Sequence, residues 1–306
     1  MKGIPFTKLQ GTGNDFVVID RIRGGRPIAK VDAVKICDRH FGVGADGVLT
    51  LMPSRKAAFR MHITNSDGSI AEMCGNGIRC AAKYVADRKL VSKFLDRGRV
   101  AEIREKAGFT VEGHARLYGF DVETGRGVLS CIVEPGKDGA VKSVWVDMGA
   151  PILERPLIPM TGDGVFQEGQ VKALGRKFKA SAVGMGNPHL VLFTDNGMEG
   201  AKKYGPALEC SPLFPNRTNV EFAHMVYDRE IEVVVWERGC GITLACGTGA
   251  CATVVAHALA GKAPWGREVK VRLSGGTLGI TVPRDLSAVF MRGEASEVFN
   301  GIWGEK

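Results

Sequence analysis

Two cysteines occupy matching settings in the two halves of the chain. Cys74 precedes a Gly-Asn-Gly turn and Cys246 precedes a Gly-Thr-Gly turn, and a helix-like run follows each, at 81–86 and 252–260. The free backbone N–H groups and the positive dipole end at the start of a helix stabilise a thiolate. Two such thiols predict a proton-transfer site in which one acts as base and the other as acid across one substrate.

The repeat extends beyond the cysteines. The Gly-x-Gly-Asn segment ending at Asn14 matches the one ending at Asn187 (187 − 14 = 173), and 41–46 matches 214–219 at the same offset. The cysteines follow at 246 − 74 = 172, and Asn65 and Glu237 each lie nine residues before their cysteine. A nearly constant offset over several landmarks predicts two copies of one structural unit.

Composition indicates a soluble globular protein of two domains, with 306 residues, 44% hydrophobic and 24% charged. No apolar run approaches the roughly 20 residues of a membrane helix, and the N-terminus lacks the apolar core of a signal peptide. We therefore expect a cytoplasmic protein without a membrane partner. None of the eight cysteines forms Cys-x-x-Cys, so we expect no metal site and reduced thiols, with Cys80 and Cys251 in the core.

The net charge is +8, and many basic residues lie within 79–108. We expect a solvated basic face there, which also attracts anionic substrates. A nucleic-acid-binding protein would need a recognisable binding module or interleaved aromatic residues. Aromatic residues make up only 7% of the chain, and we expect no nucleic-acid partner.

Alternating or continuous apolar runs predict strands at 16–20, 47–52, 59–64, 141–147, 190–193, 230–236, 269–273 and 278–282. A short helix is predicted at 28–38, after Pro27. The stretch 93–142 is charged and weakly periodic and is expected to form strands with long turns, including an added hairpin. One helix per half among many strands is not a βαβ pattern, which argues against a doubly wound dinucleotide fold.

Seven motifs of the chain carry a resemblance to a known family: 11–20, 39–47, 65–69, 74–80, 186–189, 236–239 and 245–250. In sequence and in order they closely resemble the motifs of the diaminopimelate epimerase family. The resemblance implies an α/β (α+β) fold of two pseudo-symmetric domains, each a β-barrel-like sheet around a central helix. We expect residues 1–143 plus 291–306 to form the N-terminal domain and 144–290 the C-terminal domain, with the last strand, near 290–302, returning to the first.

The resemblance also implies an isomerase that interconverts LL- and meso-diaminopimelate in lysine and peptidoglycan precursor synthesis. It assigns catalysis to Cys74 and Cys246, assisted by His189 and Glu237. The family's substrate-binding positions fall on Asn65, Asn187, Asn219 and Arg238 at the distal centre, and on Asn14 and Asn76 near the reacting centre. No cofactor is implied. Stabilisation of the α-carboxylate is then expected from the backbone N–H groups of the two turns, Gly75, Asn76, Gly77, Gly247, Thr248 and Gly249.

Two positions depart from the family pattern. Ile242 stands where the family often has Glu, and Phe299 stands where it often has Tyr near a homodimer contact. The alternative within this fold is a racemase acting on another amino acid, which should lack a partner such as Arg238 for the distal carboxylate. A non-catalytic amino-acid-binding protein would have lost one of the cysteines, and both are present.

Overall fold

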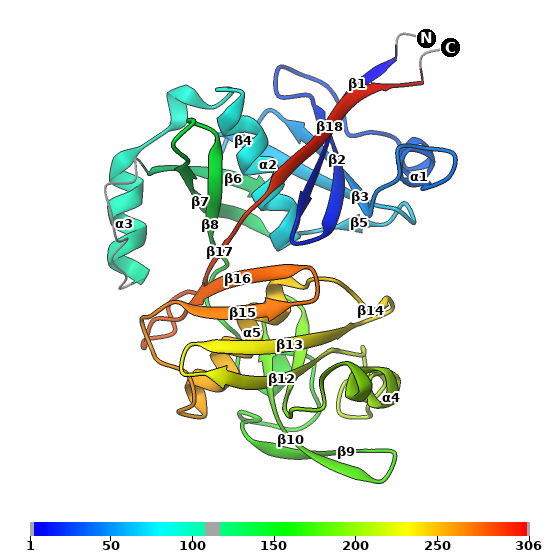
Figure 1. The fold of residues 1–306 in the computed structure, drawn as a ribbon, viewed down its shortest axis with the longest axis vertical. Coiled ribbons are helices and arrows are strands. Elements are labelled where there is room, and N and C mark those ends of the chain that lie inside the picture. The colour runs from blue at the N-terminus through cyan, green and yellow to red at the C-terminus, as the bar shows by residue number, and fades with distance from the viewer. Residues whose placement is uncertain (1–2, 108–116, 305–306) are drawn as a thin grey trace. The chain divides into compact units, whose positions relative to one another are not determined.

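The computed structural model describes residues 3–107 and 117–304 (Figure 1). The chain divides into two compact units. Within the described residues, unit 1 comprises 3–103, 117–147 and 292–304, and unit 2 comprises 104–107 and 148–291. Of the residues that the structure describes, no helix is both long and apolar enough to cross a membrane.

Unit 1 is a mixed sheet around one helix. Its strands are β1 (Ile4–Gly11), β2 (Asn14–Asp20), β3 (Gly47–Met52), β4 (Phe59–Asn65), β5 (Ile70–Ala71), β6 (Tyr118–Thr124), β7 (Gly127–Pro135), β8 (Val141–Asp147) and β18 (Ser296–Trp303). Strand β2 runs parallel to β3, and β4 runs parallel to β6, while the other pairs are antiparallel. Helix α2 (Gly75–Asp87) contacts seven of these strands, β1, β2, β3, β4, β7, β8 and β18. The second helix is α1 (Lys30–Cys37).

Unit 2 repeats this order of elements. Its strands are β9 (Gly169–Ala173), β10 (Arg176–Gly184), β11 (Pro188–Phe193), β12 (Asn219–Tyr227), β13 (Glu230–Glu237), β14 (Gly241–Ile242), β15 (Val269–Leu273) and β16 (Gly276–Thr281). As in unit 1, two pairs are parallel, β11 with β12 and β13 with β15. Helix α5 (Gly247–Leu259) is the counterpart of α2, and α4 (Gly197–Glu209) covers β12 and β13. The short turn η2 (Arg155–Leu157) precedes β9.

The repeat predicted from the sequence offsets is therefore a repeat of topology. The pairs β2–β3 and β11–β12 are parallel at the same place in each unit, and each short strand, β5 or β14, leads into the central helix. Strand β17 (Phe290–Gly293) leads from unit 2 back to unit 1. Strand β18, drawn in red in Figure 1, then pairs antiparallel with β1.

The two central helices begin at the cysteines for the same local reason. Cys74 (φ −141°, ψ 120°) and Cys246 (φ −122°, ψ 109°) are extended N-cap residues, and glycine follows each. Helix α2 stops before Lys89, which has a left-handed φ of 55°, and α5 stops before Gly261, with φ 69°. A residue in that region is a common helix terminator. Both helices are buried over almost their whole length, including Cys80 and Cys251 as predicted.

Two expectations for the region after Cys74 were wrong. The segment 93–142 contains the turn η1 (Ser92–Phe94) and helix α3 (Arg97–Ala107) before β6, β7 and β8; the predicted strands are found only after residue 117. The residues 108–116 of that segment lie outside the described part of the chain. The basic stretch is also not one solvated face, because Arg79 is fully buried and Lys83 is only 9% exposed.

Candidate active-site halves

The first half-site is built around the sulfur of Cys74. The Gly77 N–H donates to Cys74 Sγ at 3.4 Å, which is the N-cap contact of α2. On another side the Cys74 thiol donates to Asn14 Oδ1 at 3.6 Å. The contacts of the sulfur thus include both a donor and an acceptor. The donor favours a thiolate and the acceptor favours a thiol.

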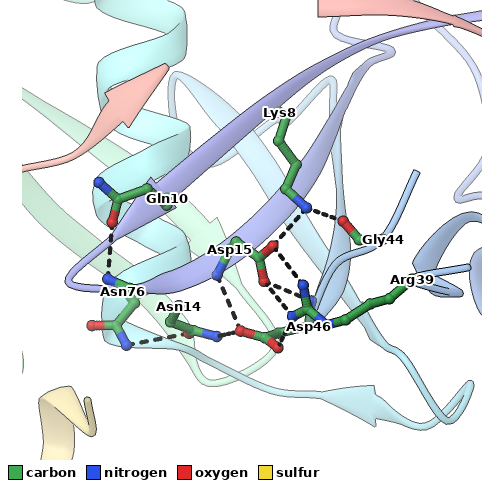
Figure 2. Close-up of polar contacts among 9 residues, drawn as sticks. Lys8, Gln10, Asn14, Asp15, Arg39, Gly44, Asp46 and Asn76 are labelled. Atoms are coloured by element: carbon green, nitrogen blue, oxygen red, sulfur yellow. Dashed lines mark hydrogen bonds and ion pairs between the residues drawn. The ribbon is translucent and has the colours of Figure 1, made fainter. Parts of the chain in front are cut away.

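The amide of Asn14 is fixed by its own partners (Figure 2). Its Nδ2 donates to Asp46 Oδ2 at 2.6 Å, and its Oδ1 accepts from Asn76 Nδ2 at 3.2 Å. The backbone N–H of Asp15 also donates to Asp46 Oδ2, at 3.1 Å. Since an ionised carboxylate only accepts hydrogen bonds, Asp46 obliges Asn14 to present its NH₂ group, which leaves Oδ1 for Cys74 and Asn76.

Behind Asn14 lies a cluster of two cations and two anions, Lys8, Arg39, Asp15 and Asp46. Arg39 Nη2 contacts Asp15 Oδ1 at 2.9 Å and Asp46 Oδ1 at 2.8 Å, and Lys8 Nζ lies 2.6 Å from Asp15 Oδ2. Lys8 also donates to the Gly44 carbonyl. Burial alone would raise the pKa of Asp15, but hydrogen bonds from Arg39 and Lys8 outweigh it and lower the pKa from 3.8 to about 2.

Arg79 fixes the other side of the half-site. Its guanidinium donates to the Gly75 carbonyl (3.2 Å), Thr12 Oγ1 (2.6 Å) and Asn76 Oδ1 (3.0 Å). A guanidinium only donates, so Asn76 must turn its oxygen toward Arg79 and its NH₂ toward Asn14. The fully buried arginine therefore orients the asparagine next to Cys74.

The second half-site is built around Cys246, which is 6% exposed. Its Sγ lies 3.4 Å from Thr248 Oγ1. Burial, followed by the charges of Glu237 and Glu221, raises the pKa of Cys246 well above 9.0, against a smaller lowering by Thr248 and the Gly249 N–H. This thiol is therefore protonated at neutral pH in the empty protein.

Glu237, at the end of β13, interacts with Cys246 through a hydrogen bond. Thr243 Oγ1 donates to Glu237 Oε1. Burial raises the pKa of Glu237 above 4.5, although hydrogen bonds from Thr243 and Cys246 and the charge of His189 lower it in part. A carboxylate with a raised pKa is a better proton acceptor than an exposed one.

His189 on β11 lies within a polar row that the parallel pairing of β11 and β12 creates. The register places His189 beside Asn219 and Val191 beside Glu221. His189 Nδ1 lies 2.7 Å from Glu221 Oε1, with both side chains fully buried, and His189 Nε2 lies 2.9 Å from Asn187 Oδ1. Both ring nitrogens are therefore held by oxygen atoms.

The remaining predicted residues of unit 2 surround the turn after β13. Asn219 Nδ2 donates to the Pro188 carbonyl at 3.0 Å, and its Oδ1 accepts from the Arg238 N–H at 2.9 Å. The exposed Arg238 guanidinium donates to the Asn216 carbonyl at 3.1 Å. Glu209, at the end of α4, accepts from Trp236 Nε1 (2.7 Å) and the Gly239 N–H (2.9 Å) and so holds this turn.

Within each unit the structure brings several predicted residues together. Unit 1 joins Asn14, Cys74, Gly75 and Asn76, while Asn65 lies at the end of β4 and donates to Ser69 Oγ at 2.9 Å. Unit 2 joins Asn187 to His189, Asn219 to Arg238, and Cys246 to Glu237, Gly247 and Thr248.

Sequence reasoning missed Asp46, Arg79, Glu221 and Thr243 as parts of the two halves. Asp46 had a detectable signal, because it occupies the repeat position of Asn219. Glu221 lies two residues after Asn219 and so on the same strand face.

Known proteins match this chain over nearly its whole length. The sequence profile of the diaminopimelate epimerase family matches residues 6–112 and 181–298. A diaminopimelate epimerase of Desulforudis audaxviator is 45% identical over 303 residues, covering 97% of this chain and 98% of the relative. Those of Pelotomaculum thermopropionicum (45% over 304 residues, 97% of each chain) and Leptospira biflexa (40% over 301 residues, 97% and 98%) are similar.

Solved structures share the fold at low sequence identity. A probable proline racemase of Agrobacterium radiobacter K84 matches with a TM-score of 0.65 at 14% identity, covering 97% of this chain and 92% of the other. A hydroxyproline epimerase of Agrobacterium vitis matches with a TM-score of 0.63 at 14% identity, covering 99% and 91%. The fold is the two-fold repeated epimerase fold, and the profile match together with the near-full-length relatives shows that this chain belongs to the diaminopimelate epimerase family.

Proposed function

We propose that this isomerase interconverts LL-2,6-diaminopimelate and meso-diaminopimelate by two-base proton transfer, with Cys74 and Cys246 acting on opposite faces of one α-carbon. The observation that carries the proposal is the duplicated N-cap cysteine, one at the start of α2 and one at the start of α5. It occurs in a chain whose relatives of 40–45% identity are named diaminopimelate epimerase.

The proposed reaction needs no external proton carrier. One sulfur, as thiolate, removes the α-hydrogen as a proton, and the other, as thiol, delivers a proton to the opposite face, so the two sulfurs exchange protonation states. Negative charge that develops toward the α-carboxylate would be stabilised by backbone N–H groups at the helix starts, those of Gly75, Asn76, Gly247 and Thr248. Such donors lower the barrier because they are in place before the charge develops.

Each thiol then has an assistant. Glu237 interacts with Cys246 and has a raised pKa, so it is suited to take the Cys246 proton when substrate binds. In the family the residues that match His189 and Glu237 assist one cysteine each, and on that resemblance we assign His189 to Cys74. The pair Glu221–His189 would hold the imidazole in one orientation while it does so.

We assign the distal, non-reacting centre of the substrate to Asn65, Asn187, Asn219 and Arg238. A guanidinium binds a carboxylate through two parallel hydrogen bonds, and amide side chains accept from ammonium and donate to carboxylate. Arg238 is exposed and Asn219 fixes its backbone at 2.9 Å. This donor set distinguishes diaminopimelate from an amino acid without a second carboxylate.

The test is isotope exchange. Reduced protein is incubated in deuterated water with LL-diaminopimelate and no added cofactor or metal, while NMR follows α-deuterium and chiral chromatography follows the meso form. Exchange with meso product is expected, and Cys74→Ser and Cys246→Ser should each abolish it. Near-normal turnover in either variant would refute the two-base assignment. If deuterium exchange occurs only with another amino acid from a panel, that amino acid becomes the proposed substrate in place of diaminopimelate, and a racemase is favoured.

Two further features stay proposals for this chain: a cytoplasmic location and a homodimer. The apolar side chains on β18 that support a contact between copies are Val298, Phe299 and Ile302, which are 56%, 45% and 58% exposed. Sedimentation equilibrium of the purified protein would measure the oligomeric state. A monomer at all accessible concentrations would contradict the dimer.

A further inference from the structure

We propose that Asp46 is a positioning residue which, through the amide of Asn14, holds Cys74 in its protonated form while the site is empty. The inference rests on the proposed function only in the role that it gives Cys74. It concerns one half-site within unit 1, and Figure 2 draws the hydrogen bonds of Asn14 with Asp46 and Asn76.

A chain of hydrogen bonds, Arg79–Asn76–Asn14–Asp46, joins a cation to a carboxylate. An asparagine amide in such a chain presents either its oxygen or its NH₂ group to each neighbour. Here both ends of the chain are unambiguous. Arg79 only donates, to Asn76 Oδ1 at 3.0 Å, and Asp46 only accepts, from Asn14 Nδ2 at 2.6 Å.

Three donors surround the carboxylate of Asp46. Arg39 Nη2 lies 2.8 Å from Asp46 Oδ1, so the carboxylate is paired with a cation through one oxygen while the other accepts from Asn14. The Asp15 N–H donates to that second oxygen at 3.1 Å. Both oxygens of Asp46 therefore act as hydrogen-bond acceptors.

The orientation of these amides determines which atom of Asn14 contacts Cys74. With both amides oriented, Asn14 Oδ1 faces Cys74 Sγ at 3.6 Å. A carbonyl oxygen accepts a hydrogen bond from S–H but places negative charge against S⁻, so this orientation favours the thiol. The Gly77 N–H at 3.4 Å favours the thiolate, as any helix start does. Asp46 acts on this balance because, together with the Arg79–Asn76 end of the chain, it determines which end of Asn14 faces the sulfur.

The substitution Asp46→Asn removes the restraint at one end of the chain. Arg39 would select the oxygen of the new amide, which leaves its NH₂ group facing Asn14. That NH₂ group then competes with Asn76 Nδ2 for the oxygen of Asn14. Whenever Asn14 turns its oxygen toward residue 46, its own NH₂ group faces Cys74, where an N–H donor stabilises the thiolate. Asp15→Asn is the matched control, because it removes one negative charge from the same cluster but keeps the contact between Asp46 and Asn14.

The experiment measures alkylation of Cys74 by iodoacetamide as a function of pH in the substrate-free protein. Peptide mass spectrometry resolves each cysteine, and the exposed Cys210 serves as an internal reference. We expect Asp46→Asn to lower the pH midpoint of Cys74 alkylation by about one unit, which is about tenfold in rate at a fixed pH below the midpoint. Asp15→Asn should move the midpoint by less than half as much.

An unchanged midpoint in Asp46→Asn, or an equal shift in Asp15→Asn, would overturn the proposal. If Asp46→Asn does not fold, Asn14→Leu decides: it removes the acceptor and leaves the Gly77 N–H, so the midpoint should again fall, and an unchanged midpoint would refute the idea. Because alkylation needs no substrate, a failure here is distinct from a failure of the epimerisation assay.

Discussion

Substitutions that break the buried pair of Glu221 and His189 should show how much this pair contributes to the free energy of unfolding. The two side chains are fully buried, with Glu221 Oε1 2.7 Å from His189 Nδ1. The second carboxylate oxygen, Oε2, is buried without a hydrogen-bond partner among the described residues. A buried carboxylate in this state is costly unless the first oxygen has a strong partner. His189→Phe would remove that partner and leave the carboxylate alone.

The magnitude follows from this burial. Removing one member of a buried pair typically costs about 3–5 kcal/mol, because a charge stays behind without compensation. We expect His189→Phe to cost about this much in the wild-type background. In Glu221→Gln a neutral amide replaces the carboxyl group, and the same change should cost only the neutral hydrogen bond and the altered packing, about 1–2 kcal/mol. The expected coupling energy is the difference between these two costs, about 1–4 kcal/mol.

The assay is a double-mutant cycle in which urea unfolding of each variant is measured at pH 7. Fluorescence and circular dichroism both monitor the unfolding, which tests whether the two transitions coincide. The pair Glu134–Arg292 in unit 1, at 3.0 Å and with side chains 16% and 32% exposed, is the control. We expect a coupling of at most about 1 kcal/mol for that more exposed pair. A coupling energy below about 0.5 kcal/mol between Glu221 and His189 would refute the reasoning, because it would mean that the two side chains do not stabilise each other.

Three further changes test neighbouring contacts. Gly249→Ala places a Cβ 2.7 Å from Glu221 Oε1, so it should lower both Tm and kcat. This is the opposite of the usual effect of Gly→Ala inside a helix, which stabilises by about 0.5–1 kcal/mol. A higher Tm with full activity would contradict the expectation. Asp15→Asn should lose about 1–2 kcal/mol of stability at pH 6, after a discount for solvent screening. The lowered pKa of Asp15, about 2, means that this contribution is present above pH 3.8 and lost as the pH falls through 2; urea unfolding at pH 6, 4 and 3 should show the difference narrowing, and a constant difference would count against it. Glu209→Gln should raise KM for diaminopimelate more than it lowers kcat, because Glu209 holds the Gly239 N–H beside Arg238; steady-state kinetics with KM unchanged would exclude that role.

Much of the architecture was predictable because burial patterns and glycine turns are local signals. The predicted ranges 47–52, 141–147 and 269–273 coincide with β3, β8 and β15. Helix α3 was missed because Arg97–Ala107 is rich in charge and has only a weak apolar face. Without an apolar stripe at helical spacing, the sequence offers little to distinguish a surface helix from a turn.

The site was predictable only in part, for a different physical reason. The glycine turns identify Cys74 and Cys246 as helix N-caps, which is a property of a few consecutive residues. The contact of Glu221 with His189 depends instead on the register of two parallel strands, and that of Asp46 with Asn14 joins residues 32 positions apart. A sequence supplies the residue types for such contacts but not the register that brings them together.

The duplication explains why the two halves share a scaffold and still treat their sulfurs differently. Asn14 and Asn187 occupy the same repeat position, yet Asn14 contacts Cys74 while Asn187 contacts His189. A neutral amide oxygen opposes a thiolate at Cys74, whereas burial and nearby carboxylates oppose it at Cys246. An enzyme that runs in both directions needs two sulfurs of comparable proton affinity, because each must act as acid in one direction and as base in the other. Two different environments that each oppose a thiolate bring the two proton affinities closer together, and in the proposed reaction a change that relaxes only one of them should alter kcat more in one direction than in the other.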